Sequence, residues 1–457
     1  MITLKKIPAP RIEEDIIPIM LTDETIIERK SRLLTKMEQY KYDTLIIYAD
    51  LEHGNNFEYL VGFLPRFEEA LLVLHADGEA YAVLGNENLN KADKMRIKVT
   101  PVHMPHLSLP NQPMKTEETV DEILAKCHFE GKNRIGIIGW KNFTNTVENS
   151  EQLYDLPHFL MDSLRKVAKD SKFFNATNLM IGASGIRTIN NANEFAHYEF
   201  GAALAGNCIL SAMDELGIGK TEMAIAEKLS AKGQRHSVVT IMAAGQRFIN
   251  GNMYPSNKKI SMGDTISMTT GYKGGLESRS GFAVNRATDL PNGQQDYLEK
   301  LAIPYFNAFK TWLETIKIGI KGGLLYDAIE DVFPKEKYNW NLNPGHLCGD
   351  EEWMSSPIYP LSQEIISSGM LFQIDIIPSI PGYHGTGCEG SIFLADTELR
   401  KQIETQYPEI WKRVLKRREY IQNVLGIQLS EEILPMSTAT GYYRPFMLNQ
   451  SLALTNN

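Results

Sequence analysis

The chain has 457 residues, more than one hydrophobic core usually serves, so we expect two or three domains. Its hydrophobic share of 43% and charged share of 23% are those of an ordinary globular protein, and its longest apolar runs are strand-sized, which excludes a membrane span. A formal net charge of -9 without a basic cluster argues against a nucleic-acid partner.

The N-terminus lacks the apolar run of a signal peptide, and the four cysteines are widely scattered with no CxxC pair. Both features predict a cytoplasmic protein with free thiols.

The first third of the chain alternates short β-like runs with helical segments. Residues 44–48, 70–74 and 80–84 are rich in branched and aromatic side chains, and an Asp77-Gly78 turn between the last two predicts a hairpin. Helical spacing follows at 118–126 and 150–167. We expect an α/β domain over residues 1–175.

A turn-rich stretch at 173–185 is interpreted as a linker to a second domain over residues 176–457. Asn191 and Glu194 form a capping-box pattern that opens a long helix through Met213, and a second helix is expected from Thr221. Further strands are predicted at 237–244, 264–270, 280–284, 370–376 and 391–394, with helices at 294–316, 324–332 and 409–424. This order favours an α+β domain.

Several phrases, in order, resemble the creatinase, prolidase and aminopeptidase P family. They are residues 43–48, 59–63 and 76–78 in the first domain, and 263–266, 344–346 and 369–372 in the second. The resemblance implies a creatinase-like α/β N-terminal domain, an α+β pita-bread C-terminal domain, a small-molecule substrate and a homodimer.

Metallopeptidases of that family hold two divalent ions with two aspartates, a histidine and two glutamates. By resemblance, the first aspartate position is Thr269, and the second falls among residues 277–280, where no aspartate stands. Hydroxyls are neutral and poor ligands for a divalent ion, so a dinuclear site is not expected. His346, Asp375 and Glu389 stand at the other family positions and leave two alternatives. They hold a single divalent ion, or they form a hydrogen-bonded polar pocket without metal or other cofactor.

Two further family histidines are replaced by Met253 and Trp353, so Xaa-Pro cleavage by the family's usual mechanism is not expected. Glu277 lies in a phrase similar to one in creatinase, which works without metal. With Asp375 and Glu389 it is predicted to bind a cationic or guanidino group, since carboxylates bind planar cations in pairs. His346 or His384 would then supply the general base.

Four residues are assigned to substrate binding, His384 among them. Arg66 aligns with a creatinase arginine that reaches the partner subunit's site, where it would bind an anionic substrate end. Arg279 either fills the space of an absent cation, paired with Asp375 or Glu389, or binds substrate. Trp353 is expected to line the pocket.

Three functional hypotheses follow. The first is a creatinase-like, metal-independent hydrolase of a C-N bond in a small zwitterionic or guanidino/amide substrate. The second is an Xaa-Pro aminopeptidase or dipeptidase that uses a single metal ion. The third is an inactive binding protein of the same fold. The first also predicts that Glu277→Ala abolishes ligand binding without affecting the fold.

Overall fold

The computed structural model describes residues 1–456, which fold into two compact units. One contains residues 21–188, and the other combines residues 1–20 with the chain from residue 189 onward. The predicted division into 1–175 and 176–457 needs correction at both ends. β1 (Thr3–Lys6) pairs antiparallel with β15 (Leu452–Thr455), which places the first residues in the C-terminal unit. β7 (Lys172–Asn175) joins the N-terminal sheet, so the predicted linker begins with a strand.

The N-terminal unit is built on a six-stranded sheet of order β5-β4-β3-β2-β6-β7. The predicted hairpin is confirmed, because β3 and β4 pair antiparallel. The helix expected at 150–167 begins only at residue 158, because Pro157 disfavours helical geometry in the residue before it. The unit's elements are α1 (Asp23–Tyr40), β2 (Thr44–Ala49), α2 (Asn55–Val61), β3 (Ala70–His75), β4 (Ala80–Leu84), β5 (Thr100–His103), α3 (Val120–Ala125), β6 (Arg134–Ile138), α4 (His158–Val167), β7 and α5 (Asn178–Ile181).

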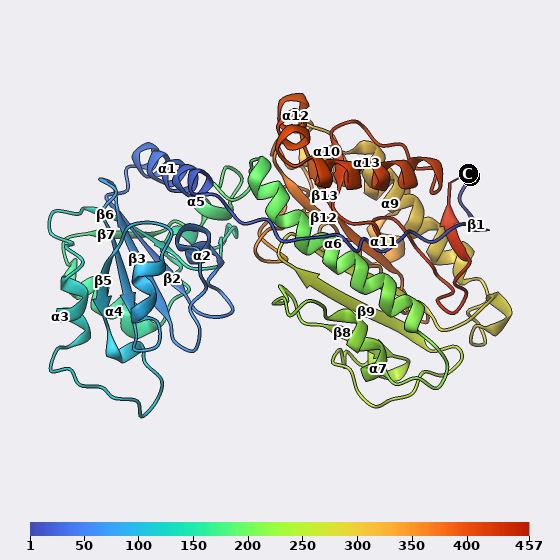
Figure 1. Cartoon of the computed structure of the whole chain (residues 1–457), viewed down its shortest axis with the longest axis horizontal. Coiled ribbons are helices and arrows are strands. Elements are labelled where there is room, and N and C mark those ends of the chain that lie inside the picture. Colours follow the sequence, from blue (N-terminus) through green and yellow to red (C-terminus); the bar gives the residue numbers. More distant parts are fainter. Residues whose placement is uncertain (457) are drawn as a thin grey trace. The chain divides into compact units, whose positions relative to one another are not determined.

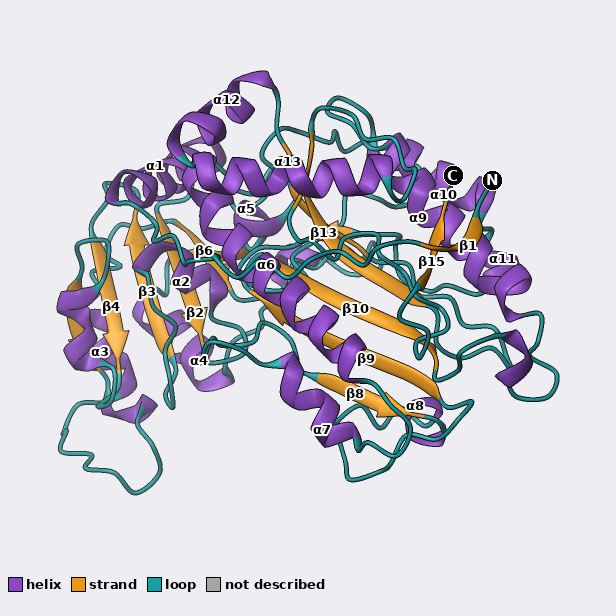
Figure 2. Cartoon of the chain, turned by 45° about the vertical axis from the view of Figure 1, so that its right-hand side comes forward, coloured by secondary structure: helices purple, strands orange, loops and turns teal. Residues whose placement is uncertain are grey.

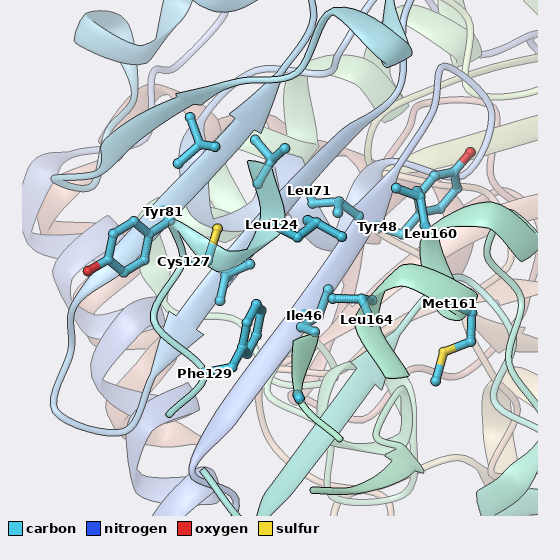
Figure 3. Close-up of a cluster of buried hydrophobic side chains, with 14 of the residues drawn as sticks. Ile46, Tyr48, Leu71, Tyr81, Leu124, Cys127, Phe129, Leu160, Met161 and Leu164 are labelled. Atoms are coloured by element: carbon cyan, nitrogen blue, oxygen red, sulfur yellow. The ribbon is translucent and has the colours of Figure 1, made fainter. Parts of the chain in front are cut away.

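One face of this sheet forms a core with α3 and α4. Figure 3 shows Ile46 and Leu71 from the sheet close to Leu124 of α3 and Leu164 of α4, all fully buried. These residues alternate with others along their strands, which is the period-2 pattern of a sheet packed against helices.

The C-terminal unit carries a seven-stranded sheet of order β11-β12-β13-β10-β9-β8, with β14 paired to β13. Its strands are β8 (Ile241–Ala244), β9 (Thr265–Tyr272), β10 (Gly275–Phe282), β11 (His346–Leu347), β12 (Leu371–Ile374), β13 (Gly387–Leu394) and β14 (Ile433–Pro435). Its helices are α6 (Ala192–Glu215), α7 (Glu222–Ala226), α8 (Gln246–Ile249), α9 (Ile303–Thr315), α10 (Gly322–Val332), α11 (Lys335–Tyr338), α12 (Thr397–Gln406) and α13 (Pro408–Asn423).

The long helix α6 covers one face of this sheet and runs along β9 and β10 (Figures 1 and 2). The predicted capping box is confirmed: the Asn191 side chain accepts from the Glu194 backbone N–H, and the Glu194 side chain accepts from the Asn191 N–H. This cap fixes where α6 begins and therefore which sheet residues it covers.

The β9–β10 hairpin is tighter than the sequence indicates. Lys273 and Gly274 form its turn, so β10 begins at residue 275 and not near the expected residue 280. Gly274 has a φ of +101°, and a Cβ there would lie 2.1 Å from the backbone oxygen of Tyr198 in α6. Only glycine fits so close an approach at positive φ. The short turn fixes the register of every side chain on β10 relative to β9.

Candidate functional site

The β9–β10 hairpin has one hydroxyl-bearing face. The hydroxyl residues on this face retain between 5% and 8% exposure, whereas residues pointing the opposite way retain at most 3%, and Met268 and Arg279 among them at most 1%. The hydroxyl residues are Thr265, Ser267, Thr269, Ser278 and Ser280. We call this set the hydroxyl face. Its residual exposure shows that it is the side of the hairpin not sealed by α6.

A row of polar side chains crosses four neighbouring strands from this face. Thr269 of β9 lies opposite Ser278 of β10, and its hydroxyl donates to the Ser278 Oγ at 2.9 Å. Ser278 in turn lies opposite Glu389 of β13. The β12–β13 register, extended by one residue, brings Asp375 beside Glu389. We call these four residues the polar row. It is neutral at its β9–β10 end and acidic at its β13–β12 end.

His346 stands at the acidic end of the polar row. Its Nε2 lies 3.0 Å from Glu352 Oε1 and 3.9 Å from Asp375 Oδ2, and its ring stacks on Trp353 with centroids 4.0 Å apart. The imidazole is fully buried. Asp375 is 4% exposed, and its Oδ1 has no hydrogen-bond partner among residues 1–456. An unpaired buried acceptor is costly, so this oxygen is available to a ligand.

Crowding of these groups shifts their protonation. Burial alone would lower the pKa of His346, but the hydrogen bond and charge of Glu352, with the charge of Asp375, raise it above its ordinary value. Desolvation raises the pKa of Asp375, with a further increase from Glu352, although His346 opposes it. Desolvation and the nearby Asp375 and Glu352 raise the pKa of Glu389 well above its usual range. Like charges that cannot all ionise therefore share protons near neutral pH.

The structure places Glu277 and Arg279 apart from the polar row, and the binding roles predicted for them stay predictions. Both lie on the face of β10 opposite Ser278, where a Cβ on Gly390 would lie 3.3 Å from Glu277 Oε1. Arg279 Nη2 pairs with Glu277 Oε2 at 3.0 Å, and each residue is 1% exposed.

Arg279 does not pair with the Asp375 or Glu389 carboxylate. Its guanidinium donates to the backbone oxygens of Ser278, Glu389, Ala439 and Tyr442. Alternation along the strand puts this ion pair behind the sheet, which favours a structural role for it.

The other predicted residues have varied settings. Trp353 contacts His346 and therefore belongs to the site. His384 is partly exposed on the loop before β13. Arg66 lies in the N-terminal unit with its guanidinium over the ring of Phe67, 4.8 Å from the centroid. The anchoring role of Arg66 stays a prediction. Met253 is partly buried in the loop after α8.

Sequence reasoning missed Glu352. Its carboxylate, 23% exposed, is the atom group closest to the His346 Nε2 in the site. The pair Glu351-Glu352 beside Trp353, six residues after His346, was the signal that could have identified it.

The donor set does not fit two divalent ions. Thr269 and Ser278 supply neutral hydroxyls that bond to each other, so this end of the row lacks the anionic ligands that hard cations need. Among residues 1–456, no group of three or more His, Cys, Asp or Glu side chains is arranged to hold a metal ion. The donor types at His346, Asp375 and Glu389 suit a single ion, but Glu352 faces Nε2 in the arrangement described.

Comparison with known proteins places this site in a family. Residues 196–399 match the Metallopeptidase family M24. The Xaa-Pro dipeptidase of Pyrococcus horikoshii is 22% identical over 262 residues, which cover 55% of this chain and 72% of that protein.

Solved structures show a similar fold over most of the chain. The prolidase from Pyrococcus horikoshii OT3 matches with a TM-score of 0.61 and 19% identity, covering 80% of this chain and 95% of that one. An Xaa-Pro dipeptidase from Bacillus anthracis matches with a TM-score of 0.62 and 17% identity, covering 82% and 96%. The X-Pro aminopeptidase from Thermotoga maritima MSB8 matches with a TM-score of 0.61 and 15% identity, covering 80% and 95%.

Fold and site together define a pita-bread domain preceded by an α/β domain, which confirms the predicted fold class. Residues 196–399 match the M24 family, and together with the fold this supports a relationship of the chain to the creatinase, prolidase and aminopeptidase P family. Its relatives favour the peptidase hypothesis over the creatinase-like one. Across residues 1–456, no helix has the length and apolar character needed to cross a membrane. The cytoplasmic location and the homodimer stay predictions.

Proposed function

We propose that this protein is a hydrolase of the Xaa-Pro dipeptidase type that acts on short peptides at the polar row. The observation that carries the proposal is the buried, unpaired Oδ1 of Asp375 beside His346. A folded protein rarely keeps such an acceptor unless a ligand uses it. The named relatives of the chain, which are Xaa-Pro dipeptidases and prolidases, supply the substrate class.

The residues at the acidic end of the polar row have two different roles, which are binding the substrate's amino group and transferring a proton. Asp375 and Glu389 attract the ammonium group of a peptide. A charge-assisted hydrogen bond between a carboxylate and a cation is strongest where water is excluded, as it is around these buried side chains. The His346–Glu352 pair can accept and return a proton, since Glu352 raises the pKa of the imidazole above its ordinary value although burial opposes this.

A single divalent ion, if bound, would be held by His346, Asp375 and Glu389 and would polarise the scissile carbonyl. Such binding requires Glu352 to leave Nε2, and its partial exposure leaves it free to do so.

A second candidate is peptide binding without turnover. The neutral hydroxyls of Thr269 and Ser278 favour it, because they remove the two-ion chemistry of the family's metallopeptidases while leaving a polar surface in place. Stabilisation by peptides without product formation would identify this function.

The test combines binding, turnover and metal content. Purified full-length protein is assayed by thermal shift and product release with Xaa-Pro and Xaa-Ala dipeptides, in chelator and with added Mn²⁺ or Zn²⁺. Asp375→Asn is expected to lose peptide stabilisation and turnover without losing stability, because it removes one member of a crowded acidic group. Asp327→Asn, on the exposed side of α10, is the matched control. Failure of every dipeptide to stabilise the wild type would refute the proposal.

A further inference from the structure

The hydroxyl face has no role in the chemistry assigned to the acidic end. Ser267 and Ser280 lie opposite each other on β9 and β10. The side-chain hydroxyls of these two residues have no hydrogen-bond partner in the described chain. The Ser278 Oγ accepts from Thr269, which leaves its own proton free to donate. Three hydroxyl donors are therefore available on the side of the hairpin that retains exposure.

These hydroxyl donors lie next to acidic side chains that a ligand could also contact. The hydroxyl face continues directly into Glu389 and Asp375, and the Asp375 side chain is nine-tenths buried with an unpaired oxygen. The Ser278 hydroxyl proton and the Asp375 Oδ1, two strands apart in the polar row, thus lack protein partners. A ligand that satisfies both groups must carry acceptors at one end and a cationic donor at the other.

We propose that the hydroxyl face binds the carbonyl and carboxylate oxygens of a zwitterionic dipeptide, with the Ser278 hydroxyl as the donor to the ligand and Thr269 as the residue that orients that hydroxyl. This proposal rests on the proposed function and specifies how the substrate is oriented. The amino end lies at Asp375 and Glu389, and the carboxyl end lies over β9 and β10. In this half of the site, neutral hydroxyl donors stand where the family's metallopeptidases have metal-bridging acids. Because these hydroxyls do not hold a metal ion, they contact the ligand directly.

The length of the row matches a dipeptide better than a single amino acid. Adjacent strands lie about 4.8 Å apart, so Ser278 and Asp375, two strands apart, are separated by about 10 Å. An extended dipeptide is about 7 Å long, so with a hydrogen bond of about 3 Å at each end it spans this separation with room for the bonds to incline toward the row. A free amino acid, about 3.5 Å long, falls slightly short even with a hydrogen bond at each end.

The first test is a double-mutant-type cycle in which the protein and the ligand are each altered, separately and together. Affinities are measured by calorimetry in the presence of chelator. The probes are the tightest-binding dipeptide, its C-terminal amide and its N-acetyl form. Thr269→Val/Ser278→Ala is expected to weaken the dipeptide about 3- to 10-fold, as loss of a hydrogen bond does. The loss should be smaller for the C-terminal amide, because its altered group is the one these hydroxyls contact, and undiminished for the N-acetyl form.

Thr270→Val is the matched control, because Thr270 lies on the opposite face of the same strand and donates to the backbone oxygen of Leu229. It should leave ligand affinity unchanged. Equal affinity of wild type and Thr269→Val/Ser278→Ala for every probe would overturn this inference while leaving the proposed function standing. A panel without any binder would instead refute the proposed function.

A second measurement does not need a peptide. Thr269→Asp/Ser278→Asp restores anionic donors at this end of the row, and we expect it to bind one more Mn²⁺ per chain than the wild type, by elemental analysis after equilibrium dialysis. Thr265→Asp/Ser280→Asp is the control with the same added charge elsewhere on the hydroxyl face. A wild type that already binds two Mn²⁺ per chain would overturn the inference.

Discussion

Replacing Glu277 tests whether the buried pair behind the sheet is structural. In Glu277→Ala, the Arg279 guanidinium keeps its bonds to backbone oxygens but loses its only carboxylate within 4 Å in the described chain. Ser437, whose hydroxyl donates to Glu277 Oε1, also loses its acceptor. The variant therefore leaves the Arg279 guanidinium charge without a carboxylate partner at a position where this side chain is only 1% exposed.

The expected cost follows from that burial. Removing one partner of a buried ion pair typically costs about 3–5 kcal/mol, because the remaining charge is desolvated without compensation. For a unit of this size, each kcal/mol shifts the thermal unfolding midpoint by about 2–4 °C, so we expect a decrease of roughly 6–20 °C. Glu277→Gln should cost less, since its amide oxygen can still accept from Ser437.

Tryptophan fluorescence during thermal unfolding is a suitable assay. Four of the five tryptophans, Trp312, Trp340, Trp353 and Trp411, lie in the C-terminal unit, so the signal reports chiefly on the unit that contains Glu277. Peptide affinity is measured on the same variants below their transition. An unchanged midpoint together with lost peptide binding would refute the structural assignment and return Glu277 to the site.

Two further predictions concern other parts of the chain. His75 contacts Thr44 Oγ1 and the Cys127 carbonyl, and burial lowers its pKa. The folded state therefore favours the neutral imidazole. Its contribution is present above the unfolded pKa of about 6.5 and is lost as pH falls, by at most about 1.4 kcal/mol per pH unit. Urea unfolding across pH should show this slope, and His75→Gln should flatten it; an equal slope in both proteins contradicts the assignment. Gly274→Ala should destabilise the fold by more than about 1 kcal/mol, since its Cβ meets the Tyr198 oxygen at positive φ. In the same thermal scans Gly293→Ala, with positive φ but open space, should cost less.

The sequence alone determined features that depend on neighbouring residues. The branched and aromatic side chains of residues 44–48 and 70–74 identified β2 and β3, and the Asn191–Glu194 pattern located the start of α6. These are local properties, because strand propensity and capping involve residues only a few positions apart. The loss of the metal-bridging acids was also visible from the residue types at Thr269 and after Glu277.

Only the tertiary structure decided which side chains share a face. The two-residue turn at Lys273 and Gly274 sets the register that faces Ser278 toward Thr269 and Glu277 away from it. A shift of one residue would exchange those faces, and nothing local in β10 specifies the turn length. The same holds for Glu352 beside His346, because their contact depends on how the loop after β11 folds back.

The division of the chain into units was decided by pairing over long sequence separation. β1 finds its partner in β15 at the opposite end of the chain, so residues 1–20 join a unit whose other members begin near residue 189. Composition and periodicity describe segments one at a time and hold no information on such pairing. The sequence therefore determined the elements and the chemistry they carry, whereas long-range packing decided which of those groups meet.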